Sequence, residues 1–219
     1  MYPTRALLSA AAVLSVAAVA APASQAATLT LDKACYVNLG SQQQPIVAAA
    51  SGLEAGKTYN VGFSAKGKSE TGYAYGPADA SGVVTLPLNS WYGGSAYDVK
   101  TYDATVTLRD GQTVLATAET KTTSVGFQAK GKRGLRSWKV TGLAALTGGT
   151  TYYAHYFNHG KYKGRLKLGK ASGPCGVFTG KRPLTPFKKI GRYEVKITTN
   201  KTFSKDDLPL TGRVVVTRY

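Results

Sequence analysis

The stretch Thr101 to Leu115 reads TYDATVTLRDGQTVL and carries the clearest structural signal in the chain. Ala104, Val106 and Leu108 alternate with polar residues, and a second apolar run follows the pair Asp110-Gly111. Apolar side chains at every second position indicate a strand with one buried face. Asp-Gly between two such runs is a strong signal for a two-residue hairpin turn. The stretch therefore predicts two antiparallel strands.

The same period of two recurs on both sides of this hairpin, and no helical period persists. It appears in residues 28–39, 59–65, 84–88, 125–129, 138–140, 152–157, 166–168, 193–197 and 214–216. Gly-rich turns such as Ala55-Gly56 and Ser81-Gly82 separate the runs. Many short alternating strands of this kind predict an all-β chain of two antiparallel β-sandwiches in series. A single large sandwich is the alternative.

The N-terminus has the three parts of a secretory signal peptide. Arg5 supplies the positive charge, residues 6–21 are uncharged and rich in Ala, Leu and Val, and Ser24-Gln25-Ala26 offers a cleavage site. The alternative is a membrane-spanning anchor, but the apolar run is shorter than the ~20 residues that a span needs. We therefore expect residues 1–26 to be removed, and the rest to be exported without a membrane span.

Charge is distributed unevenly over the exported part. Residues 28–122 hold 7 Lys and Arg against 8 Asp and Glu, whereas residues 123–219 hold 20 against 3. Such asymmetry suggests two domains and an anionic partner for the second. We place the domains at residues 27–122 and 123–219.

Two groups of motifs resemble known bacterial modules. Ser51-Gly52-Leu53, Ala55-Gly56-Lys57-Thr58-Tyr59 and Ala78-Asp79-Ala80-Ser81-Gly82 resemble turns of bacterial immunoglobulin-like domains. Tyr153-Ala154-His155-Tyr156, Gly160-Lys161, Leu166-Lys167-Leu168-Gly169, Gly173-Pro174-Cys175-Gly176 and the Tyr193 strand resemble a module of secreted actinobacterial proteins of unknown function. The resemblance covers most of the exported chain. It implies two immunoglobulin-like sandwiches and export, and it implies no activity.

Cys35 and Cys175 are the two cysteines of the chain. Outside the cell a lone pair is usually oxidised, so we expect one disulfide between the domains, with two reduced thiols as the alternative.

The sequence lacks the motifs of common enzymes. There is no G-x-S-x-G, no H-E-x-x-H and no P-loop. His155 and His159 are the two histidines, and as metal ligands they would need Glu194, Asp206, Asp207 or Cys175 beside them. A free Cys175 paired with His155 is the enzymatic alternative. We expect neither catalysis nor a cofactor nor a metal.

Cations in the second half occupy alternate positions of two predicted strands, and alternate residues of a strand project from one face. The first of these strands should place Tyr162, Leu166 and Leu168 on the opposite, core face. The expected polyanion-binding residues are Lys161, Lys163, Arg165, Lys167, Arg192 and Lys196. A merely solvated surface is the alternative.

These patterns together predict a secreted, non-catalytic binding or structural protein. Its expected partner is an anionic polysaccharide or phosphate polymer of the cell envelope. Nucleic acid is less favoured because no base-reading motif is present, and a monomer is favoured. A protein–protein adapter is a further alternative.

Leu208-Pro209-Leu210-Thr211-Gly212 matches the Leu-Pro-any-Thr-Gly pattern of sortase substrates. Arg213 and six further residues follow, too few for the ~20 apolar residues of a membrane stop. We expect this segment to lead into a last strand instead.

Overall fold

The computed structural model describes the chain in these stretches: residues 26–39, 43–94, 99–130, 135–146, 150–183, 190–207 and 210–216. Residues 1–25 of the predicted signal peptide lie outside the described residues, as do the second-half cations Lys132, Arg133, Lys188 and Lys189. Within the described stretches, no helix is long and apolar enough to cross a membrane.

Two sheets form the described part of the first half. The chain order of the strands is β1 (Thr28–Leu31), β2 (Cys35–Asn38), β3 (Ile46–Ser51), β4 (Thr58–Ala65), β5 (Thr71–Pro77), β6 (Val84–Leu88), β7 (Thr101–Asp110) and β8 (Thr113–Ser124). The three-stranded sheet has the order β1-β3-β6, and the five-stranded sheet has the order β2-β8-β7-β4-β5.

The predicted alternation places one face of each sheet in a common core. In β4, Tyr59, Val61, Phe63 and Ala65 are buried and face the apolar residues of β3 and β6. Trp91 closes this core with its ring 6.3 Å from that of Phe63. Burying apolar side chains between two sheets is the main force that holds such a sandwich together.

The Ala78–Gly82 segment forms the turn between β5 and β6. The Asp79 carboxylate accepts hydrogen bonds from the backbone amides of Ser81 (2.8 Å) and Val83 (3.0 Å), and Gly82 has a φ of 72°. The hydroxyl and amide donors around this carboxylate lower the pKa of Asp79. An aspartate that bonds the backbone ahead of it is a typical turn former, and glycine tolerates the positive φ.

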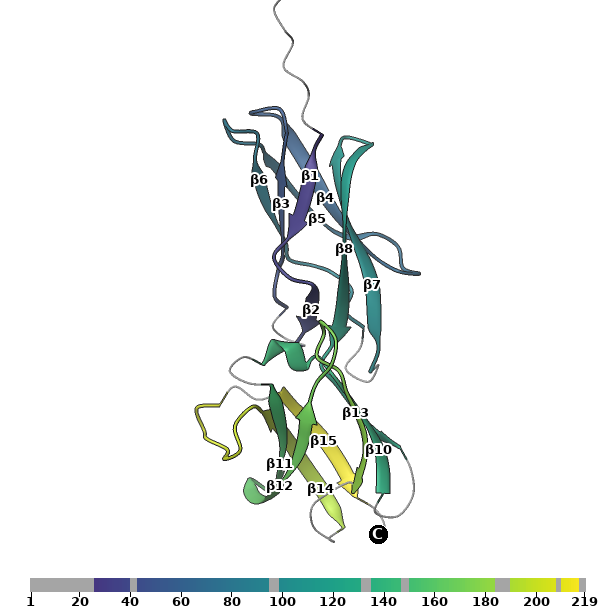
Figure 1. Ribbon diagram of the computed structural model, residues 1–219, viewed down its shortest axis with the longest axis vertical. Helices are drawn as coiled ribbons and strands as arrows, with labels where there is room; N and C mark the ends of the chain where they lie inside the picture. Colours follow the sequence, from purple (N-terminus) through teal and green to yellow (C-terminus); the bar gives the residue numbers. More distant parts are fainter. Residues whose placement is uncertain are drawn as a thin grey trace, which may run out of the picture.

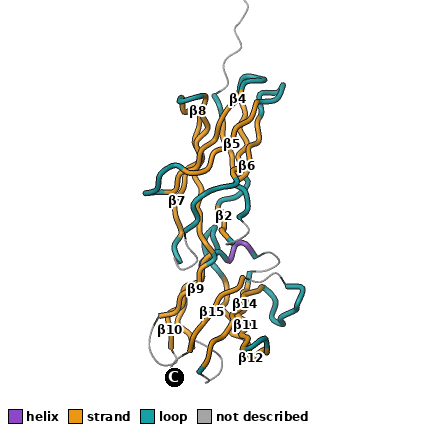
Figure 2. The backbone as a smooth tube through the Cα atoms, turned by 180° about the vertical axis from the view of Figure 1, so that it is seen from behind, coloured by secondary structure: helices purple, strands orange, loops and turns teal. Residues whose placement is uncertain are grey.

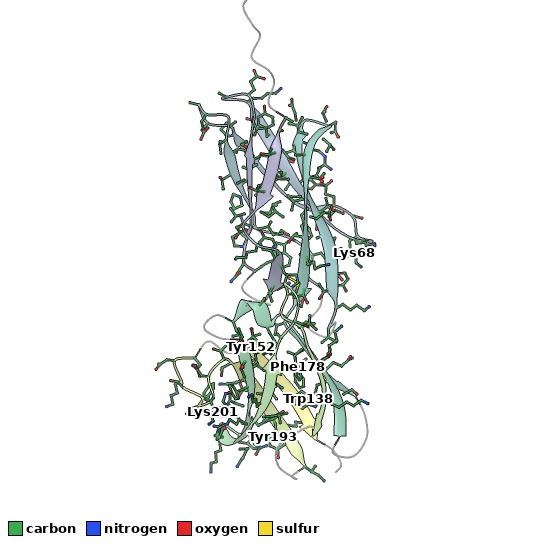
Figure 3. The ribbon with its side chains drawn as sticks, in the orientation of Figure 1. Lys68, Trp138, Tyr152, Phe178, Tyr193 and Lys201 are labelled. Atoms are coloured by element: carbon green, nitrogen blue, oxygen red, sulfur yellow. A yellow bond between two sulfur atoms is a disulfide. The ribbon has the colours of Figure 1, made fainter. Side chains whose placement is uncertain are left out.

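The described residues of the second half also form two sheets. Its strands are β9 (Gly126–Lys130), β10 (Leu135–Thr141), β11 (Thr151–Asn158), β12 (Lys161–Lys170), β13 (Phe178–Pro183), β14 (Gly191–Thr198) and β15 (Leu210–Val216). The three-stranded sheet has the order β13-β10-β9, and the four-stranded sheet the order β12-β11-β14-β15. Trp138 and Phe178 of the three-stranded sheet pack with Tyr152 and Tyr193 of the four-stranded sheet in a core that is separate from that of the first half (Figure 3).

Both halves use one strand order. If β2 is set aside, the first, second and fifth strands of each half form one sheet, and the fourth, third, sixth and seventh form the other. This is an immunoglobulin-like Greek-key arrangement. The predicted fold class, two immunoglobulin-like sandwiches in series, is confirmed, and the single large sandwich is wrong. The predicted boundary at residues 122 and 123 falls inside β8 and stays a prediction.

The two sandwiches lie end to end, so the molecule is elongated (Figures 1 and 2). The short helix η1 (Leu143–Ala145) lies at their junction. The predicted disulfide is present there: Cys35 of β2 bonds Cys175, in the turn before β13, with the Cα atoms 5.2 Å apart. Backbone amides of Leu143 and Ala144 donate to the carbonyls of Gly176 (3.0 Å) and Cys175 (3.4 Å). The turn that carries Cys175 is therefore fastened to both halves.

The alternation predicts one continuous strand face over residues 28–39, but the structure has two strands in two different sheets there. The chain leaves the three-stranded sheet after β1 and joins the five-stranded sheet as β2, parallel to β8. Tyr36, which the alternation places outward, is 1% exposed and belongs to the core. At the crossover, the Asp32 carboxylate accepts hydrogen bonds from the Tyr36 hydroxyl and the Val47 amide. These bonds hold the bend that shifts the phase of the alternation.

The predicted hairpin is present, with its turn one residue further along. Asp110 pairs with Thr113 inside the ladder, so the two turn residues are Gly111 and Gln112. Gly111 has a φ of 57°, as a tight hairpin turn requires.

The sortase-like segment ends in the last strand. Leu210 and Thr211 lie in β15 and pair with Ile197 and Lys196 of β14, and Leu210 is buried. Leu208 and Pro209 lie outside the described residues. A peptide bond fixed in a sheet is not presented to a transpeptidase, so the structure agrees with a strand at this position.

Candidate functional site

The predicted row of cations on β12 is interrupted by a β-bulge. Tyr162 pairs with Phe157, but the next pair is Gly164 with Tyr156, which leaves Lys163 as the extra residue. Residues that face each other across an antiparallel ladder point to the same side of the sheet. Tyr162 therefore shares the outer face with Phe157, and the prediction that it faces the core is wrong. Its side chain is 49% exposed.

The bulge divides the predicted cations of β12 into two groups. Arg165 pairs with His155, and Lys167 pairs with Tyr153, so both lie on the outer face of the four-stranded sheet. Lys161 pairs with Asn158 and projects from the opposite side, next to the turn at His159 and Gly160. Both turn residues have positive φ, 47° and 74°, which suits a two-residue hairpin. The structure therefore brings together Arg165 and Lys167, but not Lys161.

The cations of β14 complete the outer face. Arg192 pairs with Val215, and Lys196 pairs with His155, so the row across the sheet reads Arg165, His155, Lys196 and Thr211. Four of the six predicted residues thus share one face: Arg165, Lys167, Arg192 and Lys196. Cα atoms two strands apart are about 10 Å from each other, so Arg165 and Lys196 flank His155.

His155 is a buried structural residue of this face. Its side chain has no exposed surface, and its ring lies 5.5 Å from the ring of Phe203. Nε2 is 3.0 Å from the backbone oxygen of Asn200 and 3.1 Å from Thr198 Oγ1. Because a carbonyl oxygen only accepts, we assign the proton to Nε2. Nδ1 is then a buried acceptor with no partner among the described residues.

The environment of His155 favours the neutral imidazole. Burial lowers the pKa of His155, and the charge of Arg165 lowers it further, against the opposing effects of the Asn200 carbonyl and Asp207. A buried cation at this position would lack a solvent shell. His155 therefore packs as an aromatic side chain.

Lys196 has partners within the chain. Its Nζ lies 5.2 Å from the ring centre of Phe157 and 5.4 Å from that of Phe203, and 3.6 Å from a Glu194 carboxylate oxygen. The side chain is 28% exposed. Cation–π contacts and an ion pair of this kind hold a cation in place. Lys196 is therefore already engaged within the chain, whereas Lys167 and Arg192 are exposed.

The segment of residues 199–207, which follows β14, crosses the outer face and adds cations that sequence reasoning did not select. Phe203 packs on Phe157 with ring centres 5.0 Å apart, and Arg165 donates to the backbone oxygen of Lys201 (3.0 Å). Lys201 is exposed at the side of the second half (Figure 3). Lys170, at the end of β12, is also exposed. Lys201 lies in a loop, where side chains follow no periodic pattern, so its place on this face became known only from the contacts in the structure.

Ion pairing differs between the halves. Among the described residues, Lys33, Lys57, Arg109 and Lys121 of the first half each contact a carboxylate within 4 Å. In the described part of the second half, the corresponding contact is Lys196 with Glu194. The first half thus pairs these four cations internally, and the second half has too few carboxylates to pair most of its own.

The alternative of a Cys175 nucleophile is wrong for the oxidised protein. Both sulfur atoms are used in the Cys35–Cys175 bond, and a disulfide sulfur is not a thiolate. His155 and His159 occupy a buried strand position and an exposed turn. Within the described stretches, no group of three His, Cys, Asp or Glu side chains is placed to hold a metal ion.

Comparisons with known proteins give structural likeness alone. No family profile matches the chain, and no curated protein matches it in sequence. A two-domain fibronectin type-III segment of chicken tenascin is 12% identical, with 86% of this chain and 97% of that chain covered and a TM-score of 0.29. The chicken interferon gamma receptor alpha chain is 9% identical, with 89% and 99% covered and a TM-score of 0.27. The chicken CNTN1 FN1–FN3 domains are 10% identical, with 87% and 64% covered and a TM-score of 0.27. These scores carry no assignment of family or activity, so the fold class rests on the strand order of the chain itself.

Proposed function

We propose that the chain is a secreted, non-catalytic binding protein that attaches to an anionic polymer of the cell envelope through its second domain. Residues 1–26 are the cleaved signal peptide, and residues 27–122 and 123–219 are the two domains. The protein acts as a monomer without a cofactor. The disulfide supports export, because such bonds persist mainly outside the reducing cytosol.

The observation that carries this proposal is the charge of residues 123–219. They hold 20 cations against 3 anions, whereas a net charge of magnitude about 2–8 is enough to keep a small domain soluble. Most of these cations have no carboxylate to pair with, so their mutual repulsion destabilises the folded domain. A polyanion relieves this repulsion and gains affinity from the release of its counterions.

The binding surface combines the outer face of the four-stranded sheet with the segment that crosses it. Arg165, Lys167 and Arg192 lie on the face, and Lys201 extends it at one side. Lys196 supports Phe203 from below and keeps the segment in place. Lys161 and Lys163 sit at the β11–β12 hairpin end and form a second, separate point of contact.

The test uses the complete exported chain on immobilised heparin and on purified envelope fragments, eluted with a salt gradient. The variant Arg165→Gln/Lys167→Gln/Arg192→Gln should elute at lower salt, and the slope of log K against log salt should fall by about 2–3. A matched control, Lys33→Gln/Lys66→Gln/Lys68→Gln, removes the same charge from the first half and should elute close to the unsubstituted chain.

Equal loss of retention in both triple variants would show that net charge alone, and not this face, determines binding. Stronger retention on single-stranded DNA than on envelope fragments at equal salt would identify nucleic acid as the partner instead. Failure of the unsubstituted chain to bind any of the three supports at ~0.15 M salt would contradict the proposal.

A further inference from the structure

Two neighbouring tyrosines are exposed on the neutral half of the molecule. Tyr73 and Tyr75 in β5 are 52% and 66% exposed. They pair with Gly62 and Asn60 of β4, whereas Ala74 between them pairs with the core residue Val61. Both rings therefore leave from the outer face of the five-stranded sheet, about 6.7 Å apart along the strand. β5 is the edge of that sheet and lies beside β6 (Figure 2).

Planar polar groups adjoin the two rings. Arg109 pairs with Asn60 across the ladder, and its guanidinium forms a two-pronged ion pair with Glu70 at 2.6 and 3.1 Å. The Glu70 carboxylate occupies the space above Gly62, where a Cβ atom would lie 1.9 Å from its Oε1. Because Gly62 has no side chain, the ion pair settles against the sheet next to Tyr73.

The same face is hollowed a few residues further along. A depression of about 370 Å³ is lined by Ser64, Lys66, Asp103, Thr105 and Glu119. Thr107, one row nearer to Tyr73, pairs with both Gly62 and Thr117 and carries the polar surface from the tyrosines to the depression. Tyr75 and Thr105 lie two strand spacings and two rows apart on this face, a direct distance of roughly 16 Å. Ligand sites in proteins commonly occupy ~300–1,000 Å³.

Charges on this face are balanced by internal pairs. Glu70 bonds Arg109, and Asp103 bonds Lys121, whose ammonium lowers the pKa of Asp103. The hydroxyl of Thr105 donates to Glu119 (2.9 Å). A face of this kind offers no excess charge to an ionic ligand. It also offers little aliphatic surface, since Val114 and Leu115 at the hairpin end are the exposed large aliphatic side chains of the described first half.

We propose that this face binds an uncharged polysaccharide chain, with sugar rings stacked on Tyr73 and Tyr75 and a further sugar unit in the depression. Tyrosine suits this role because its ring is apolar and its hydroxyl is polar. Sugar rings present C–H groups on one side and hydroxyls at the rim. Asn60, Thr107 and the Arg109–Glu70 pair lie where they can exchange hydrogen bonds with those hydroxyls, and paired planar groups favour two-pronged contacts. The site is on the opposite half from the basic face and does not depend on it.

The test is retention of the exported chain on a panel of uncharged polysaccharides: cellulose and chitin as solids, and mannan and a β-glucan cast in native gels. The unsubstituted chain should be retarded by at least one of them. The variant Tyr73→Ala/Tyr75→Ala should bind that polysaccharide at least about tenfold more weakly, because two stacking surfaces are lost. Tyr73→Phe/Tyr75→Phe keeps the rings and should retain most of the binding. Tyr162→Ala removes the tyrosine that is exposed in the described part of the other half and should bind normally.

Salt separates this site from the basic face. Stacking and neutral hydrogen bonds should survive roughly 1 M sodium chloride, where the screening length falls to about 3 Å and ionic attachment is released. Thermal melts of each variant confirm folding, which is expected because both rings are exposed. The inference is overturned if no polysaccharide of the panel retards the chain, if the double alanine variant binds as well as the unsubstituted chain, or if binding disappears in high salt.

Discussion

Replacing Cys35 and Cys175 together by serine tests how the two halves are coupled. The bond joins β2 of the first sandwich to the turn before β13 of the second, and both cysteines are buried, at 7% and 1% exposure. Removing it leaves the cores of both halves intact. The effect should therefore appear mainly in the unfolded state, where the chain gains freedom that the bond denies it.

The separation of 140 positions sets the size of the effect. Chain-entropy estimates give about 5 kcal/mol at 25 °C for a closed loop of this length, as an upper value. If the first half unfolds while the second stays folded, the loop runs from Cys35 to the end of β8 at Ser124. Because the entropy depends only on the logarithm of loop length, the expected loss is still about 4–5 kcal/mol.

The two tryptophans allow each half to be followed separately. Trp91 is buried in the first core and Trp138 in the second. Urea unfolding monitored by fluorescence should report the first half in a Trp138→Phe background and the second half in a Trp91→Phe background. With a slope of about 2 kcal/mol per molar urea, the first transition should move down by roughly 2 M in the serine variant. The two transitions should also separate, since only the peptide chain between β8 and β9 then joins the halves covalently.

The control is the same chain with both cysteines present, unfolded with and without reductant. Free thiols should be absent before reduction, and the reduced chain should reproduce the serine variant. A shift below about 0.5 M urea in both backgrounds would refute the reasoning, as would two thiols that titrate without reductant.

Four further substitutions probe single residues. Because burial lowers the pKa of His155 below its ordinary value of about 6.5, its neutral form stabilises the fold fully above that pH, and this contribution is lost as pH falls through the lower folded-state pKa. The stability of the unsubstituted chain, measured by urea unfolding, should therefore decline more steeply below pH ~6.5 than that of His155→Gln; parallel profiles would contradict this. Gly176→Ala should lower the free energy of unfolding by well over 1 kcal/mol, since a Cβ there would lie 2.3 Å from a backbone nitrogen and the residue has a φ of 64°. Gly160→Ala, with a φ of 74° and open space around it, should lower the free energy of unfolding by only about 1 kcal/mol. Equal losses of melting temperature in the two variants would argue against a tight contact of Gly176 at the junction. Tyr36→Phe removes the hydrogen bond to Asp32 and should lower the free energy of unfolding by about 1–2 kcal/mol in urea titrations, and an unchanged midpoint would show that the bond is not needed at the crossover.

Several strands of both sandwiches could be predicted from local sequence. In β4, β6, β7 and β14 every apolar residue of the alternation is buried, because the extra residues at irregular pairs lie in the partner strands β5 and β8 and each of the four strands buries one side. Period two is then a direct record of which side faces the core. The disulfide was also predictable, because the chain offers each cysteine no other partner.

Irregular pairing explains where prediction failed. Between β1 and β2 the chain changes sheets, so residues on both sides of Cys35–Asn38 become buried. In β12 the extra residue Lys163 breaks the alternation, so that Tyr162 before it and Arg165 and Lys167 after it all lie on the outer face. Neither event leaves a signal in the alternation itself, because the letters continue with period two through the irregularity.

For the candidate sites, composition and topology contributed different information. The amino-acid sequence alone indicated an all-β chain, favoured two sandwiches over a single large one, and showed that the cations gather in the second half. These properties follow from local periodicity and from counts, which do not depend on contacts. Which cations share a surface, that Lys196 is held by Phe157 and Phe203, and that Tyr73 and Tyr75 stand exposed beside Arg109 became known only from the tertiary structure. Strand register and sheet exchange determine these neighbours, and both depend on the packing of residues that are far apart in the chain.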